Sequence, residues 1–142
     1  MADHILDKGY PVLATYNASA VAGVTQFRVV KLLTTGFIDL AVTAVAATGN
    51  IGVVQENVDQ AKVATGKAVV DVRIMGVSKV VVQTAAGITL GTRVMCGSAG
   101  GAIAAATTGS EVLGFVVGTN SSAGTVGAGD IIDVLLTPKV LF

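Results

Sequence analysis

Charged side chains are scarce in this sequence of 142 residues. Asp, Glu, Lys and Arg together make up 13% of it, about half of the roughly 25% found in ordinary soluble domains. Nine basic and nine acidic residues cancel, and the basic ones are scattered along the chain. Since nucleic-acid binding needs a concentrated basic face that neutralises phosphates, we expect no nucleic-acid partner.

Histidine and cysteine are almost absent, which removes most catalytic and metal-binding arrangements. The single cysteine, Cys96, excludes an internal disulfide and a cysteine-based zinc site. The single histidine, His4, leaves a Ser-His-Asp relay or a histidine metal cluster without its components. Because Cys96 follows Val94 and Met95, we expect its thiol to be buried in a core. The sequence therefore predicts no catalytic residue, metal or cofactor, and a protein that is not an enzyme.

The glycine-rich segments do not match the known phosphate-binding loops. The dinucleotide fingerprint requires three glycines at fixed spacing, and after Gly127 and Gly129 its third position is Ile132. The other phosphate loop needs a glycine five residues before a Gly-Lys pair, where this chain has Ala61 before Gly66. Neither motif is present, which leaves turns as the explanation for the glycines.

Long hydrophobic runs are also missing. One of the long uncharged runs, residues 112–129, contains five glycines, whereas a membrane-spanning helix needs about 20 largely apolar residues. The opening MADHILDKG has charged residues and no apolar core, so it does not resemble a signal peptide. We expect a soluble chain with no membrane partner. An apolar surface on such a chain is usually covered by another protein.

Valine, isoleucine and threonine are abundant, and they favour a pleated, half-buried strand. They occur in short runs separated by turn residues. This pattern predicts an all-β fold, a small barrel or sandwich of short antiparallel strands and hairpins, with at most one or two short helices, at 42–49 and 57–66. The expected strands are 11–16, 26–32, 37–43, 52–55, 68–75, 78–83, 93–96, 102–105, 112–118 and 130–137.

An internal repeat relates residues 51–74 to residues 113–136 without a gap. Each unit reads as a strand, a polar loop and a second strand, which predicts two hairpin-like units. Asp71 and Asp133 occupy equivalent positions in them. A catalytic carboxylate pair is one interpretation of these two residues. The polar face of a strand, with Arg73 two residues from Asp71, is the one we favour.

The segment GSAGGAIAAATTG, residues 97–109, lacks any charged side chain. It predicts a hairpin in which residues 97–101 form the turn. Its small side chains permit another backbone to approach closely.

Several stretches together resemble the capsid decoration, or cement, proteins of tailed bacteriophages. The first is the polar opening MADHILDKGYPVLATYNASAVAG, and the second is the centre IGVVQENVDQAKVATGKAVVDVRIMGVSKVVV. The third is GITLGTRVMCGSAGGAIAAATTGSEVLGFVVG, followed by GDIIDVLL. Residues 34–50 lie outside this resemblance.

The resemblance implies a structural virion protein that is made in the host cytoplasm and binds the outer surface of an assembled phage capsid. Its partners would be the major capsid protein and itself, as a homotrimer at three-fold and quasi-three-fold positions that stabilises the head. The alternative is a phage fibre or tail β-domain that binds a host surface component. Recognition sites favour aromatic and charged anchors. With two Tyr and four Phe available, the structural interpretation is favoured.

The two ends of the chain are the candidate capsid or trimer contacts. Residues 1–23 are interpreted as a capsid-docking arm or as a first strand, and residues 24–142 as the β-rich decoration domain. An extended arm can pair its backbone with the edge of a capsid strand. The candidate interface residues are Ile5, Leu6, Tyr10, Val12 and Tyr16 near the start, and Val140, Leu141 and Phe142 at the end.

Overall fold

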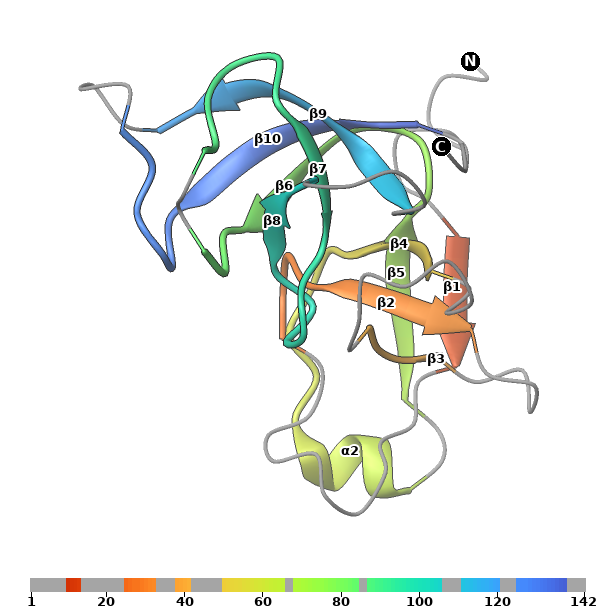
Figure 1. Ribbon diagram of the computed structural model, residues 1–142. Helices are drawn as coiled ribbons and strands as arrows, with labels where there is room; N and C mark the ends of the chain where they lie inside the picture. Colours follow the sequence, from red (N-terminus) through yellow and green to blue (C-terminus); the bar gives the residue numbers. More distant parts are fainter. Residues whose placement is uncertain are drawn as a thin grey trace.

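The computed structural model describes residues 10–13, 25–32, 38–41, 50–65, 68–84, 87–105, 111–120 and 125–137. They form two five-stranded antiparallel sheets, drawn one above the other in Figure 1. The first sheet has the order β1-β5-β4-β2-β3 and contains β1 (Tyr10–Leu13), β2 (Val29–Leu32), β3 (Ile38–Leu40), β4 (Asn50–Val54) and β5 (Val69–Arg73). The second has the order β6-β10-β9-β7-β8 and contains β6 (Gly76–Val81), β7 (Arg93–Cys96), β8 (Ala102–Ala104), β9 (Val112–Thr119) and β10 (Ile131–Leu136).

The all-β prediction is confirmed, and each of the ten predicted strands overlaps a strand of the structure. The differences lie at the strand ends. The predicted strand 68–75 ends at Arg73, and Gly76, with a φ of 80°, begins β6 in the other sheet. Of the two candidate helices, the one within 57–66 is present as α2 (Gln60–Ala64), and residues 42–49 lie outside the described part of the chain.

Helix α2 covers one face of the first sheet. Its N-cap is Asp59, whose carboxylate accepts a hydrogen bond from the backbone N–H of Lys62 at 2.7 Å, a favourable arrangement for a helix start. Val63 points inward and packs with the valines of β4 and β5. Figure 1 shows the helix at the end of the molecule opposite the second sheet.

The second sheet curls until its two edges meet. Val82, directly after β6, forms a parallel bridge with Ala102 on β8, and the N–H of Gln83 donates to the carbonyl of Ala102 at 2.8 Å. The hydrophobic side chains on the inner face of this curved sheet form the larger of the two cores. The two edges thus meet at one place, at Val82 and Ala102.

The two sheets are copies of one another in strand order and in register. The bulge between β2 and β4 recurs at the same place between β7 and β9. The predicted repeat, which covered β4, β5, β9 and β10, is thus part of a duplication of all five strands. Three residue pairs of the first sheet show the match. Val53–Arg73 corresponds to Phe115–Leu135 in the second sheet, Val30–Leu40 corresponds to Val94–Ala104, and Tyr10–Val72 corresponds to Ser78–Val134.

A pair of equivalent glycines shows how far the likeness extends. Gly52 on β4 and Gly114 on β9 occupy the same position in the repeat. A Cβ atom at Gly52 would overlap the carbonyl oxygen of Arg73, and one at Gly114 would overlap that of Leu135. Both sheets therefore bring two backbones together at a distance that only glycine allows.

The two halves are joined by a shared core. Val29, Ala41 and Val53, on the upper face of the first sheet, pack into the core of the second sheet. The predicted hairpin of residues 97–101 is present between β7 and β8. Its Gly100, with a φ of 69°, lies against Leu40, and its carbonyl accepts a 2.7 Å hydrogen bond from the N–H of Val29. The backbone that approaches this segment is thus the first half of the same chain.

Candidate functional site

The structure places two of the predicted interface residues on β1. Tyr10 and Val12 lie at register positions opposite Val72 and Val70 of β5, which makes β1 an edge strand of the first sheet. The backbone groups on the far side of an edge strand can pair with a partner strand. That β1 contacts a capsid subunit stays a prediction. The remaining predicted residues, Ile5, Leu6, Tyr16, Val140, Leu141 and Phe142, lie outside the described residues.

A second surface, which the sequence did not single out, lies on the outer face of the second sheet. Four directly paired residues form a row across it: Arg93 on β7, Phe115 on β9, Leu135 on β10 and Val77 on β6. We call these four residues the outer row. Leu135 is 41% exposed and Val77 is 45% exposed. Beside the row, Val117 on β9 is 49% exposed.

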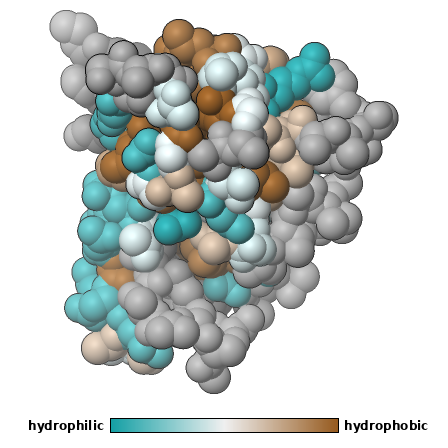
Figure 2. Space-filling model, turned by 60° about the vertical axis from the view of Figure 1, so that its left-hand side comes forward, coloured by the Kyte–Doolittle hydropathy of each residue, from teal (hydrophilic) through white to brown (hydrophobic). Residues whose placement is uncertain are grey.

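Figure 2 shows that hydrophobic surface gathers mostly in the upper part of the molecule, where Figure 1 places the second sheet. The lower part of the same view is mostly hydrophilic. Single exposed hydrophobic side chains are normal on a soluble protein, whereas a group of them indicates an interaction surface. The outer row is therefore the strongest candidate among the described surfaces.

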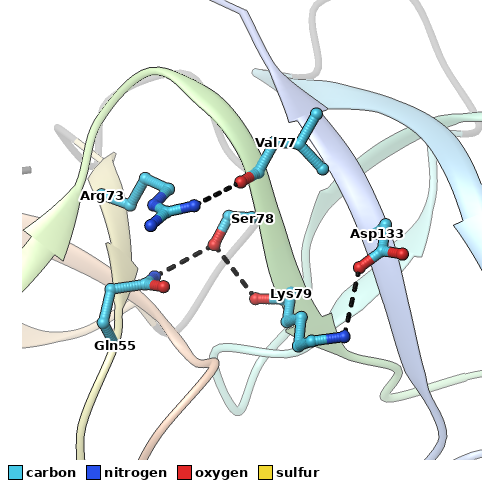
Figure 3. Close-up of polar contacts among 6 residues, drawn as sticks. All are labelled: Gln55, Arg73, Val77, Ser78, Lys79 and Asp133. Atoms are coloured by element: carbon cyan, nitrogen blue, oxygen red, sulfur yellow. Dashed lines mark hydrogen bonds and ion pairs between the residues drawn. The ribbon is translucent and has the colours of Figure 1, made fainter. Parts of the chain in front are cut away.

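An ion pair lies beside the outer row. Lys79 Nζ lies 3.5 Å from a carboxylate oxygen of Asp133, as Figure 3 shows, and both side chains are exposed. Exposed pairs of this kind add little to stability. Asp71, the other member of the hypothetical carboxylate pair, lies on β5 in the other sheet at the equivalent position. The two aspartates thus lie on the outer faces of two different sheets.

Cys96 is buried, as predicted, and this keeps its thiol protonated. Burial raises its pKa to about 12, and the nearby negative charge of Glu111 acts in the same direction. A hydrogen bond with the backbone of Gly100 opposes these effects only in part. Since the thiolate is the nucleophile and metal ligand, this cysteine has the properties of a packing residue.

In the part of the chain that the structure describes, no three His, Cys, Asp or Glu side chains come together as a metal ion would require. Among the same residues, no helix has the length and apolar character needed to cross a membrane.

Comparisons with known proteins give a match in fold and none in sequence. No family model matches the sequence, and no curated protein matches it either. Among solved structures, the fold is similar to the head fiber gp8.5 N base of bacteriophage phi29, with a TM-score of 0.59 and 13% sequence identity. The match covers 94% of this chain and 98% of that one. The two chains therefore share a fold over almost their whole lengths.

Proposed function

We propose that this protein is a structural component of a phage virion that binds the outer surface of the assembled head as a homotrimer and stabilises it. The observation that carries the proposal is the fold, which this chain shares over nearly its full length with the base of a phage head fiber. The resemblance of the sequence to capsid decoration proteins points independently to the same part of a virion.

The described surface has the composition that such a role requires. Charged residues are scarce in the sequence, and the large hydrophobic side chains that are exposed on strands lie mostly on the second sheet. In a trimer each chain would make the same weak contact with the capsid, and three linked contacts bind at a high effective concentration. Strong single-site recognition is therefore unnecessary.

The test is co-sedimentation of the purified chain with undecorated heads of the cognate phage. We expect saturable binding to assembled heads and none to free capsid subunits. Heads that carry the protein should release their DNA at a higher temperature than bare heads. Absence of co-sedimentation at micromolar concentrations would reject the proposal.

The role of the N-terminal segment needs a truncation that keeps β1. Because residues 10–13 pair with β5, a chain lacking residues 1–22 would also lose a strand. A chain that begins at Tyr10 keeps the sheet, and we expect it to bind heads more weakly if residues 1–9 form the docking arm. Unchanged binding would show that residues 1–9 are not needed for docking and that another surface binds the head.

The alternative, a fibre domain that binds the host surface, is supported by one observation: the structural neighbour is described as part of a head fiber. Incubating the labelled chain with host cells tests it. Binding to cells without binding to heads would favour this alternative.

A further inference from the structure

The duplication shows what covers the outer row in the other half of the molecule. The first-half counterparts of Arg93, Phe115 and Leu135 are Val29, Val53 and Arg73, which form the same paired row across β2, β4 and β5. Val29 and Val53 are completely buried. They are buried because the second half of the chain packs on them. The same structural position is thus an interface in one half and an exposed surface in the other.

We call Val29, Val53 and Arg73 the covered row. Figure 3 shows two contacts, one made by Arg73 and one by Gln55 beside the row. Arg73 donates from a guanidinium nitrogen to the carbonyl of Val77 at 2.7 Å. The side-chain amide of Gln55 donates to the hydroxyl of Ser78 at 3.0 Å. Both acceptors lie on β6, so the covered row of the first sheet docks against the β6 edge of the second.

The equivalent of β6 in the first half is β1. Register places Tyr10 at the position of Ser78 and Val12 at that of Val80. On the other side of the contact, Val117 is the counterpart of Gln55 in the repeat. The chain therefore has two further surfaces equivalent to those that meet between its halves. One is the outer row, on the second sheet, and the other is the β1 edge, on the first sheet.

We propose that the outer row binds the β1 edge of a second copy of this chain, so that copies associate head to tail and repeat the contact between the two halves. Such a contact joins two different surfaces, and it forms a closed ring when the rotation between copies allows it. Three copies joined in this way would give the homotrimer of the proposed function, on which this inference builds. The ring would contain six similar five-stranded units, each covering the row of its neighbour.

The composition of the outer row fits this occupant better than a charged partner. Phe115, Leu135 and Val77 are apolar, and Arg93 is the sole charge among the four. In the contact between the two halves of the chain, Arg73 lies in a row with the buried Val29 and Val53 and donates to a backbone carbonyl of β6. The outer row also contains one arginine among apolar residues.

The first test measures the mass of the full chain in solution by light scattering and sedimentation, without capsids. The variant Val77→Glu/Leu135→Lys makes the row polar and places opposite charges on a directly paired position, which limits damage to the sheet. We expect the unchanged chain to be a trimer and this variant to self-associate at least 100-fold more weakly. The control Lys62→Glu, at an exposed position on α2, at the end of the molecule opposite the second sheet, should remain trimeric.

The second test is a disulfide cross-link between copies. Val117 and Tyr10 are the counterparts of Gln55 and Ser78, whose side chains touch within the chain. The double variant Tyr10→Cys/Val117→Cys should form covalent oligomers on mild oxidation, whereas Tyr10→Cys/Val69→Cys should form far fewer. Circular dichroism verifies that each variant is folded.

A chain that stays monomeric at every concentration, or a folded polar variant that keeps the mass of the unchanged chain, would overturn the inference. Because neither test involves heads, the result does not depend on capsid binding. Loss of capsid binding with an intact ring would contradict the proposed function and leave this contact in place.

Discussion

At Gly52 and Gly114 the fold leaves no room for a side chain. In each case the position of a Cβ atom is taken by a carbonyl oxygen of the neighbouring strand. A backbone that must move to admit one methyl group loses ladder hydrogen bonds as well as packing.

We therefore expect Gly114→Ala to lower the free energy of unfolding by about 2–4 kcal/mol, measured by chemical denaturation. Gly118→Ala on the same strand is the matched control. There the nearest atom is the carboxylate of Asp133, at the end of a movable side chain. An equal loss in both variants would show that the close approach at Gly114 is not the cause.

Cys96 leads to a prediction about reactivity and pH. Its pKa is raised to about 12 because the thiol is buried, so a thiol reagent should react very slowly with the folded chain at pH 8 and rapidly in denaturant. In the unfolded chain the thiol ionises near its ordinary pKa of 9.0. The unfolded state thus gains stability as the pH rises from about 9 towards 12.

The melting temperature should therefore fall more steeply above pH 9 in the unchanged chain than in Cys96→Ala. The substitution itself creates a cavity, so the comparison concerns the slope with pH and not the absolute value. Parallel slopes, or fast modification of the folded chain, would show that the thiol is accessible to solvent.

At the scale of elements, the turn between β7 and β8 belongs to the second half and packs against the first sheet. A Cβ atom at Gly100 would lie 2.8 Å from a methyl group of Leu40 and 3.0 Å from the carbonyl oxygen of Val29. The turn is thus held against the first sheet both by a hydrogen bond and by the absence of a side chain.

Gly91 provides a control for this turn, because its φ of 79° is similarly left-handed but the space around it is open. Gly91→Ala should cost about 1 kcal/mol through backbone strain alone. Gly100→Ala should cost clearly more, since it also disturbs the contact between the halves. Thermal denaturation of the two variants gives the comparison, and similar losses would mean that the turn contributes nothing beyond its own conformation.

The sequence predicted the elements well because each strand carries its own local signal. Alternation in residues 68–75 puts Val70 and Val72 on one face of the strand and Val69 and Asp71 on the other, and in the structure the first pair is buried and the second exposed. The full duplication was not visible, because equivalent positions differ in polarity: Lys31, Asp39 and Asn50 correspond to Met95, Ile103 and Val112. Only the part rich in valine and glycine kept a similar sequence.

The candidate site was harder to predict. On a strand with apolar residues on both faces, such as β9 with its LGFVV, alternation does not say which face is covered. Phe27 illustrates a second limit. Its φ of 64° matches that of Gly91 at the equivalent position, but an aromatic residue gives no signal for this conformation. Spatial position, rather than residue type, defines the outer row.

At the scale of the whole molecule, the two sheets should unfold together. Val29, Ala41 and Val53 of the first half complete the core of the second, so a chain without the first half would expose that core to water. We expect a single transition when unfolding is followed by circular dichroism and by the reactivity of Cys96. A fragment of residues 76–142 should lack a cooperative transition. Two separate transitions, or a stably folded fragment, would show that each half is an independent domain.

The shared glycines also carry information about descent. Gly52 and Gly114 occupy equivalent positions, each against the equivalent carbonyl of its own sheet, while much of the surrounding sequence has diverged. Such a pair is most simply inherited from a shorter ancestral gene that encoded one five-stranded unit. Fusion of two copies of that gene would let each unit diverge separately. The same face would then bind the other half of the chain in the first unit and a separate chain in the second.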